Sequence, residues 1–396
     1  MIFINPPSAV NPELPNLSLA YAATVNNARV VDLNTRPHPS NRFLDSKSQK
    51  VYISVRPFNI TSSQEIKDKY LQKYPDTKVT SVSGFIDVLC CYPFIDFNDG
   101  LKYPISFSDS YPFPNYELFD SFEIFKKNWQ SGKWSYSIMT SLGCPYQCVY
   151  CQSHNRKWFP RSAKNCYEEL KQAKTKYGIK TFSLLDDCFN LDKKRVIDFC
   201  RFIKPLKLKW FCTNGLRADR FDEDIAKAMA DSGCVHIGFG AECMDDTILK
   251  NIRKGVTVNQ IKKAVRIAKR YFQGVHCFFI IGLPGSTFEK DINNLRWVVK
   301  ESITGHFSYW SPFNEANEAD PFYGDQAIPK SNAYSIPLQK RIYHMTRYMR
   351  AGNYSWIATA VNRIKLIWIF DRTNIFSHIS IEVKKKIKLW IHSINF

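Results

Sequence analysis

The sequence predicts an α/β protein with two parts, a short domain at the N-terminus and a larger unit of repeated strand and helix pairs. From about residue 134 onward, short runs rich in β-branched and aromatic residues alternate with stretches of helical periodicity. The first 110 residues hold a separate and smaller α/β pattern. A chain of 396 residues with 44% hydrophobic residues is long enough to bury a core in both parts.

The N-terminal part, residues 1–110, alternates predicted strands and helices. The expected elements are a strand within 2–8, a helix over 17–24, strands over 29–33 and 51–55, a helix near 64–74 and a strand over 78–82. This pattern is short for a full doubly wound domain. The proline-punctuated run from Tyr111 to Tyr116 predicts an extended linker, which we place at 111–133.

Residues 134–325 contain six strand candidates in succession. The strands are expected at 135–140, 181–185, 209–213, 235–240, 276–281 and 306–311, with helices near 161–177, 192–204, 222–232, 257–272 and 287–300. Six such units in a row imply parallel strands with right-handed crossovers. The predicted fold is therefore a partial (βα)6 TIM-like barrel, with ligand sites at the carboxyl ends of its strands.

The C-terminal region, residues 326–396, is predicted to be helical and basic. The runs 364–370 and 387–391 mix apolar residues with lysines, so a helix packed on the barrel is the first interpretation and an interfacial membrane helix the second. Over the whole chain, 55 Lys and Arg outnumber 36 Asp and Glu, giving a formal charge of +19. That excess favours anionic partners without choosing among nucleic acid, phosphorylated substrates, acidic lipids and an acidic electron donor.

Two features predict a cytoplasmic protein. No stretch approaches the roughly eighteen apolar residues of a membrane span, and the N-terminus lacks a basic segment followed by a long apolar one. Most of the twelve cysteines stand singly in apolar runs, which is typical of small core residues in a reducing compartment. The isolated ones are Cys166, Cys200, Cys212, Cys234 and Cys277.

Three other cysteines share one short loop after the first strand of the barrel. Cys144, Cys148 and Cys151 form a Cys-x3-Cys-x2-Cys array that supplies three thiolates and no fourth. A [4Fe–4S] cluster held by three cysteines keeps one iron open, whereas a structural zinc ion takes four protein ligands. An iron–sulfur cluster is the favoured interpretation, and a zinc site, to which His154 is an isolated further candidate, or a catalytic thiol remains the alternative.

This loop, with Tyr150 just before its last cysteine, resembles the signature loop of radical S-adenosylmethionine (SAM) enzymes. In that family the cysteines bind a [4Fe–4S] cluster, and the amine and carboxylate of SAM chelate the open iron. An electron from the cluster then cleaves SAM and releases a 5′-deoxyadenosyl radical. A cofactor of this kind needs a site that excludes water, and a barrel mouth suits that need.

Segments after the later strands resemble the other cofactor contacts of the family. An acidic pair follows the second strand, where a helix N-cap is the alternative interpretation, and a polar Thr-Asn-Gly-Leu-Arg run follows the third. The fourth strand ends in a glutamate, and the turn after the fifth resembles the one that lines the adenine pocket. The implied cofactor-binding residues are Tyr150, Asp186, Asp187, Thr213, Asn214, Arg217, Glu242, Ile281 and Gly282.

The N-terminal part resembles the Rossmann-like domain that precedes the barrel in cobalamin-binding radical SAM enzymes. The resemblance rests on the opening Ile-Asn-Pro-Pro-Ser, the following Leu-Ser-Leu-Ala-Tyr-Ala-Ala and the Pro-Phe-Pro-Asn-Tyr run. It implies cobalamin as a further cofactor. The chain lacks an Asp-x-His-x-x-Gly loop and has Ser83, Gly84 and Phe85 where a glycine-rich turn is expected, so a degenerate module without cobalamin is the alternative.

The resemblance implies an enzyme that methylates or rearranges an unactivated carbon of a small-molecule or peptide substrate. A flavodoxin- or ferredoxin-like protein would supply the electron, and the basic charge allows an anionic substrate. Methylthiolation of a tRNA or protein is the second hypothesis, although Cys90 and Cys91 are poorly spaced for a second cluster. A non-enzymatic basic protein with a structural metal site, binding nucleic acid or a membrane surface, is the third.

Overall fold

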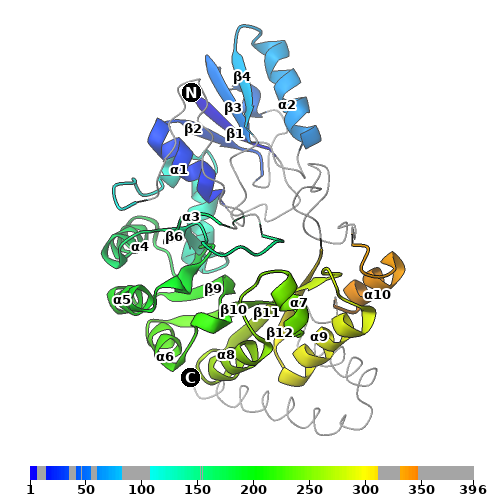
Figure 1. Ribbon diagram of the computed structural model, residues 1–396. Helices are drawn as coiled ribbons and strands as arrows, with labels where there is room; N and C mark the ends of the chain where they lie inside the picture. Colours follow the sequence, from blue (N-terminus) through cyan, green and yellow to red (C-terminus); the bar gives the residue numbers. More distant parts are fainter. Residues whose placement is uncertain are drawn as a thin grey trace.

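The computed structural model describes residues 1–6, 15–34, 42–45, 47–54, 60–82, 108–151, 153, 155–310 and 331–346. Within them the chain forms two parallel sheets flanked by helices, the smaller above the larger in Figure 1. All the strands and helices predicted from the sequence in these residues are present. The prediction of a mixed α/β fold with parallel sheets is therefore confirmed.

The N-terminal sheet has the strand order β2-β1-β3-β4, all parallel. Its elements are β1 Ile2–Asn5, α1 Leu17–Asn26, β2 Arg29–Asp32, the short helix η1 Arg42–Asp45, β3 Lys50–Ser54, α2 Ile60–Lys73 and β4 Lys78–Val82. Alternate residues face opposite sides. Phe3 and Tyr52 belong to the core that continues into the larger unit, whereas Ile4 and Ile53 pack on the side of α2.

The predicted linker contains a helix. After the short helix η2 Tyr116–Leu118, residues Phe122–Ser131 form α3. Phe125 and Trp129, one helical turn apart, are buried, and Trp129 packs against Tyr116 with ring centroids 5.0 Å apart. Proline spacing predicted the extended run before Tyr116, but the aromatic pair shows that the second half of 111–133 is part of the core.

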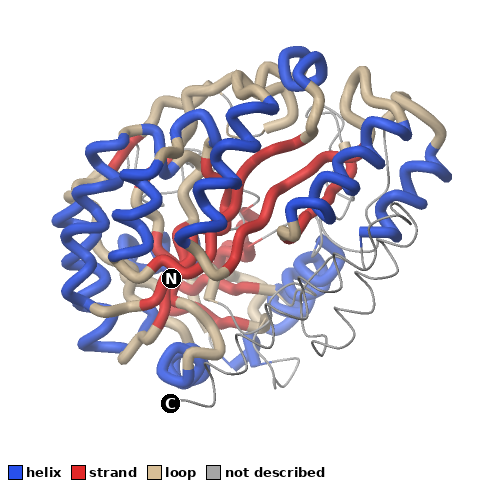
Figure 2. The backbone as a smooth tube through the Cα atoms, turned by 90° about the horizontal axis from the view of Figure 1, so that it is seen from below, coloured by secondary structure: helices blue, strands red, loops and turns tan. Residues whose placement is uncertain are grey.

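The larger sheet has the order β12-β11-β10-β9-β8-β5, and all of its strands run parallel. The strands are β5 Tyr136–Ile138, β8 Thr181–Leu184, β9 Lys209–Leu216, β10 Cys234–Glu242, β11 Gly274–Ile281 and β12 Thr304–Tyr309. Helices α4 Ala163–Tyr177, α5 Lys193–Ile203, α6 Glu223–Asp231, α8 Val258–Tyr271 and α9 Phe288–Glu301 connect them. These helices lie along the outside of the sheet (Figures 1 and 2). The short helix α7 Asp246–Asn251 was not predicted.

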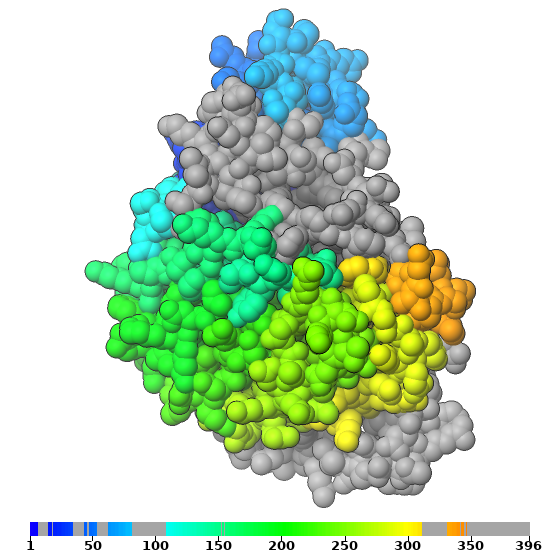
Figure 3. Space-filling view, in the orientation of Figure 1, coloured from blue at the N-terminus to red at the C-terminus, as the bar shows by residue number. Residues whose placement is uncertain are grey.

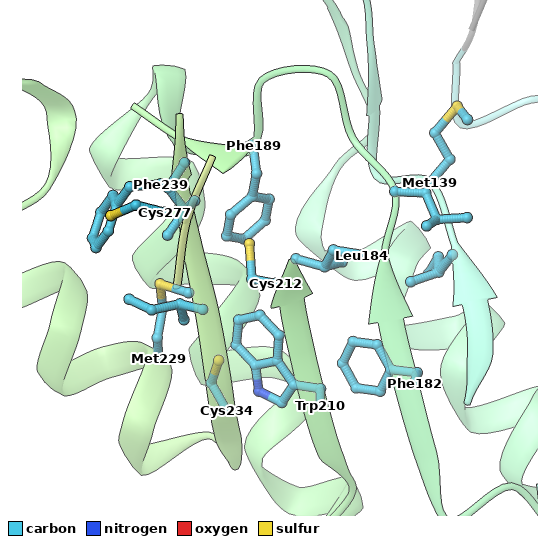
Figure 4. Close-up of a cluster of buried hydrophobic side chains, with 14 of the residues drawn as sticks. Met139, Phe182, Leu184, Phe189, Trp210, Cys212, Met229, Cys234, Phe239 and Cys277 are labelled. Carbon is cyan, nitrogen blue, oxygen red and sulfur yellow. The ribbon is translucent and has the colours of Figure 1, made fainter. Parts of the chain in front are cut away.

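Aromatic and sulfur-containing side chains fill the space between this sheet and its helices (Figure 4). Phe182 of β8 stacks on Trp210 of β9 with ring centroids 5.7 Å apart. The isolated cysteines of the sequence are buried free thiols, as predicted: Cys166, Cys200, Cys212, Cys234 and Cys277.

The described part of the C-terminal region contains the helix α10 Ile336–Thr346, whose orange atoms lie beside the yellow surface of the larger unit in Figure 3. Its Tyr343 is buried and stacks on Tyr309 of β12, with centroids 4.7 Å apart. The runs 364–370 and 387–391, together with Ser83 to Phe85, Cys90, Cys91 and His154, lie outside the described residues. In the part of the chain that is described, no helix is long and apolar enough to cross a bilayer.

Candidate functional site

A cavity of about 530 Å³ lies at the carboxyl ends of the larger sheet's strands. Cys144, Cys148 and Cys151 all line it. Its size is typical of a small-molecule site. Among the described residues, no three His, Cys, Asp or Glu side chains are arranged around a single point as one metal ion would require.

The cysteine loop is closed at its base by a short antiparallel pair, β6 Ser141–Leu142 with β7 Phe159–Pro160. Gly143 begins the loop at φ +85°, and a Cβ there would lie 2.2 Å from the carbonyl oxygen of Lys157. Glycine is therefore needed where the two arms of the loop approach each other. Inside the loop, the Arg156 amide donates to the Cys144 carbonyl at 2.8 Å.

The acidic pair after β8 holds this loop in place. Asp186 is buried and does not line the cavity. It accepts hydrogen bonds from the Thr140 amide, the Thr140 hydroxyl and the Ser141 hydroxyl, each at 2.6 Å. Asp187 lines the cavity and accepts from the Gly143 amide at 3.0 Å and the Ser153 hydroxyl at 2.8 Å. Burial raises the pKa of the Asp187 carboxyl. The structure thus gives Asp186 an anchoring position behind the loop and leaves Asp187 at the cavity.

The three loop thiols differ in acidity. A hydrogen bond with the neighbouring Cys188 thiol lowers the pKa of Cys144 to about 7. Burial raises the pKa of Cys148, and it raises that of Cys151 to about 12. Iron must therefore replace protons on Cys148 and Cys151 at neutral pH, as is general for thiol ligands. The donor set, three thiols of one loop facing one cavity, fits an iron–sulfur cluster by its chemistry.

A buried ion pair contacts the cysteine loop through Tyr150. The Lys254 ammonium donates to Glu242 Oε1 at 2.8 Å and to the Tyr150 hydroxyl at 3.0 Å. Burial alone would lower the pKa of Lys254, but Glu242 and Cys148 raise it above its usual value, so the lysine is charged. A Cβ on Gly240 would lie 2.7 Å from the Lys254 ammonium and 2.8 Å from Glu242 Oε1, so the pair requires a glycine there.

Glu242 itself has an unusual backbone. It lies at φ +62°, next to the point where the register of β10 with β11 shifts. A non-glycine residue in this region costs about 1–3 kcal/mol and persists where the surrounding structure holds it. The bulge turns the carboxylate at the end of the strand into the cavity, whose lining includes it.

The residues at the end of β9 and just after it lie partly in the cavity lining and partly outside it. Asn214 and Arg217 line the cavity. The Arg217 guanidinium lies 3.3 Å from the centre of the Tyr146 ring and pairs with Asp219 at 2.9 Å. Thr213 is outside the lining, and its carbonyl accepts from a ring nitrogen of His276 at 3.2 Å. We call Asp187, Arg217, Glu242 and Lys254 the charged wall.

Ile281 and Gly282, predicted in an adenine pocket, lie just behind the cavity. Ile281 is buried in the core, and the neighbouring Ile280 lines the cavity instead. The Gly282 amide donates to Asp291 at 2.8 Å, and its carbonyl accepts from the Ser331 hydroxyl. The turn therefore joins β11 to α9 and to the segment before α10.

The far side of the cavity is formed by β11, β12 and α10. We call it the neutral wall, and its residues are Phe278, Ile280, His306, Phe307, Ser308, Tyr309 and Tyr343. None of these was predicted from the sequence. Alternation along β12 places His306 and Ser308 on the same face, but no motif marked them.

Sequence reasoning also missed Lys254 and Cys188, both of which line the cavity. Cys188 directly follows the acidic pair, so its position was available from the same segment. Lys254 follows α7, and the positive φ of Arg253 and Gly255 on either side marks a tight turn that the Lys-Gly pair could have indicated.

The comparisons with known proteins identify the larger unit. Residues 138–298 match the model of the Radical SAM superfamily. This segment holds the cysteine loop and the charged wall, and the match agrees with the resemblance to radical SAM enzymes.

Two curated relatives of this chain are methyltransferases. The chain is 36% identical over 211 residues to an uncharacterised methyltransferase of Pyrococcus horikoshii, covering 52% of this chain and 45% of the relative. It is 29% identical to the cytidylyl-2-hydroxyethylphosphonate methyltransferase of Streptomyces wedmorensis, covering 44% and 35%. It therefore spans less than half the length of these relatives.

Two solved structures share the fold. A radical SAM methyltransferase from Kitasatospora setae, TsrM, matches with a TM-score of 0.61 at 15% identity over 78% of this chain and 72% of that one. The cobalamin-dependent SAM radical enzyme OxsB matches with a TM-score of 0.57 at 15% identity, over 94% and 61%.

Proposed function

We propose that this chain is a radical SAM enzyme that methylates an unactivated carbon of a small-molecule substrate. The observation that supports it most is one cavity lined by three thiols of a single loop and by the charged wall. The match of residues 138–298 to the Radical SAM superfamily supports the cofactors, and the methyltransferase relatives support the reaction. Rearrangement of the substrate is the alternative reaction, and the presence of a cyclase among the relatives is consistent with it.

Cys144, Cys148 and Cys151 would hold a [4Fe–4S] cluster, and SAM would lie between it and the charged wall. Together these groups supply the one-electron cleavage that starts the reaction. The chain's own residues orient them. Asp186 and Asp187 fix the base of the cysteine loop through backbone amides and hydroxyls.

The charged wall offers both signs of charge to a zwitterionic ligand. The carboxylates of Glu242 and Asp187 suit an amine or a sulfonium, and Lys254 and Arg217 suit a carboxylate. Asn214 and Tyr150 line the same cavity and add neutral hydrogen-bonding groups. Because Arg217, Glu242 and Lys254 are buried, their interactions with a ligand are stronger than they would be in water.

For the finer architecture, we infer a partial (βα)6 barrel over 134–325, preceded by a Rossmann-like domain over 1–110. Six parallel strands in chain order with helices between them support the first, and a parallel four-stranded sheet supports the second. Because the core joins both parts through α3, the segment 111–133 would act as a rigid connection.

We infer cobalamin as the methyl carrier from the relatives and from the shared fold. The segments that follow β1, β2, β3 and β4 lie outside the described residues, so no cobalamin contact is assigned to a residue. An electron donor of the flavodoxin or ferredoxin kind and a cytoplasmic location stay predictions. Methylthiolation of a tRNA or protein, and a binding protein with a structural metal site, stay alternatives.

Anaerobic reconstitution tests the proposal. The chain is loaded with iron and sulfide, reduced with SAM, and analysed for 5′-deoxyadenosine and S-adenosylhomocysteine with and without cobalamin. We expect 5′-deoxyadenosine, and cobalamin-dependent S-adenosylhomocysteine. A cluster-loaded sample that forms neither product contradicts the proposal, and binding of zinc in place of the cluster supports the third alternative.

A further inference from the structure

Three histidines lie on successive strands of the larger sheet, His236 on β10, His276 on β11 and His306 on β12. In the strand registers Gly238 pairs with His276, and Phe278 pairs with His306. Each histidine is therefore one layer of side chains nearer the cavity than the one before it. His276 is buried, and His306 is exposed and lines the cavity.

The rings of this histidine column are in contact. His236 Nε2 and His276 Nδ1 are 2.8 Å apart, and the rings of His276 and His306 meet edge to face with centroids 4.7 Å apart. Phe278 lies on another side of His306, with centroids 5.5 Å apart. These neighbours restrict the His306 ring to a narrow range of orientations.

The hydrogen bonds indicate which ring nitrogens of His276 and His236 carry a hydrogen. The Thr213 carbonyl can only accept, so His276 Nε2, 3.2 Å away, carries a hydrogen. Neutral His276 then accepts at Nδ1 from His236 Nε2. Burial and the neighbouring His306 and His236 lower the pKa of His276 to about 3, which agrees with a neutral ring.

Two glycines make room for the column. A Cβ on Gly238 would lie 2.2 Å from His276 Nε2, and a Cβ on Gly274 would lie 2.4 Å from His236 Nδ1. Any other residue at these positions would displace an imidazole. The column is thus a built feature of the sheet, with space provided on the two partner strands.

The neutral wall around His306 differs from the cofactor side in its chemistry. Among the described residues that form it, none carries a carboxylate, an ammonium or a guanidinium. It presents the flat rings of Phe278, Tyr309 and Tyr343 beside the His306 imidazole and the Ser308 hydroxyl. Such a surface suits an uncharged ring with a hydrogen-bonding group at its edge.

We propose that His306 is a substrate-binding residue, that His276 and His236 position it, and that the neutral wall binds an uncharged aromatic or heteroaromatic ring of the substrate. This inference rests on the proposed function, because it assigns the charged wall to SAM and leaves the neutral wall to the substrate. The hydrogen bonds of His276 to the Thr213 carbonyl and to His236 hold the His276 ring, and its edge-to-face contact with His306 limits the orientation of the His306 imidazole.

Fluorine NMR with three small probes tests this proposal on the reconstituted chain, with S-adenosylhomocysteine present to occupy the charged wall. The probes are neutral 5-fluoroindole, anionic 4-fluorobenzoate and cationic 4-fluorobenzylamine. We expect saturable binding of fluoroindole and at least about five-fold weaker binding of it by the His306→Phe variant, the effect of one lost neutral hydrogen bond. Tighter binding of either charged probe, or unchanged binding by His306→Phe, would overturn the proposal.

The positioning role has its own readout. His276→Phe keeps the ring but removes both hydrogen bonds, so fluoroindole binding should weaken by about two-fold although His306 is intact. The double variant His276→Phe/His306→Phe should bind no more weakly than His306→Phe alone, and additive losses would refute positioning. Lys262→Gln, on the exposed side of α8, is the control with wild-type binding.

Thermal unfolding checks each variant for folding. If His276→Phe does not fold, His276→Gln replaces it, and the His306→Phe comparison decides the substrate contact by itself. Because the probe experiment measures binding only, a chain that fails to cleave SAM can still bind fluoroindole. The SAM-cleavage assay therefore tests the proposed function, and the fluoroindole experiment tests the substrate-binding role of His306 separately.

Discussion

The two walls of the cavity differ in what holds them and in what they can bind. The charged wall consists of paired ionic groups, such as Lys254 with Glu242 at 2.8 Å and Arg217 with Asp219 at 2.9 Å. The neutral wall consists of rings in contact, such as Tyr309 with Tyr343 and His276 with His306. The first is set by loops after the strands, and the second by the strand interiors and α10.

This difference separates a general task from a specific one. Paired charges near three thiols suit a cofactor that many enzymes share, and the superfamily match covers that side of the cavity. The neutral wall includes β12 and α10, which lie beyond residue 298, where the family match ends. Substrate choice is therefore expected to depend on the neutral wall.

The largest effect is expected from the cysteine loop. Cys151→Ser should abolish cluster loading and 5′-deoxyadenosine formation, because a hydroxyl does not replace a thiolate on iron. Cys188→Ser is the matched control, since Cys188 lines the same cavity outside the predicted triad. Iron and sulfide analysis should show a loaded control and an empty Cys151→Ser chain, and the reverse result would contradict the ligand assignment.

The second-largest effect is expected from breaking the ion pair between Lys254 and Glu242 in the charged wall. Lys254→Met leaves the Glu242 carboxylate buried without its partner, at a cost of about 3–5 kcal/mol in the free energy of unfolding. Lys227→Met breaks the exposed pair with Asp231 and should have little effect on the free energy of unfolding, because water screens that pair. Urea unfolding measures both, and equal losses would show that the Lys254 pair is not effectively buried. Adding Glu242→Gln to Lys254→Met should recover part of the loss.

The charged wall was largely predictable from the sequence because its residues follow strands. Glu242 ends β10, Asn214 lies near the end of β9 and Arg217 just after it, and Asp187 follows β8, so parallel pairing alone brings them together. Asp186, Thr213, Ile281 and Gly282 occur in the same segments but point elsewhere. A strand-end motif locates a segment, whereas the hydrogen bonds of Asp186 to Thr140 and Ser141 decide where each side chain points.

The neutral wall was not predictable because the positions of its residues relative to one another depend on the pairing register of β10, β11 and β12. His236, His276 and His306 are 40 and 30 residues apart, and only the pairing of β10 with β11 and of β11 with β12 places them in one column. The space that Gly238 and Gly274 leave for the imidazoles likewise depends on the pairing of β10 with β11. Helix α3 was missed for a related reason, since its burial depends on aromatic partners from distant segments.

The pH dependence of the free energy of unfolding should reveal that His276 in the histidine column is neutral. The folded-state pKa of His276 is about 3, below the ordinary value, so the unfolded chain binds more protons between about pH 6.5 and pH 3. The free energy of unfolding should therefore fall as the pH falls through this window, by about 1.4 kcal/mol from this group at pH 5.5. Urea unfolding at pH 7.5 and 5.5 measures the fall, and His276→Phe should reduce it by that amount. An equal fall in the variant would show that His276 titrates normally.

The smallest effect is expected where α10 completes the neutral wall. Tyr343→Leu keeps an apolar side chain of α10 but removes the stack on Tyr309, which is worth about 0.5–1.5 kcal/mol. If the stack forms part of the substrate side, fluoroindole binding should weaken while SAM binding to the charged wall stays unchanged. Lys340→Ala, on the exposed side of the same helix, is the control for helix stability. Weaker SAM binding in Tyr343→Leu would mean that the two walls act on the same ligand, and the division of the cavity into a cofactor side and a substrate side would fail.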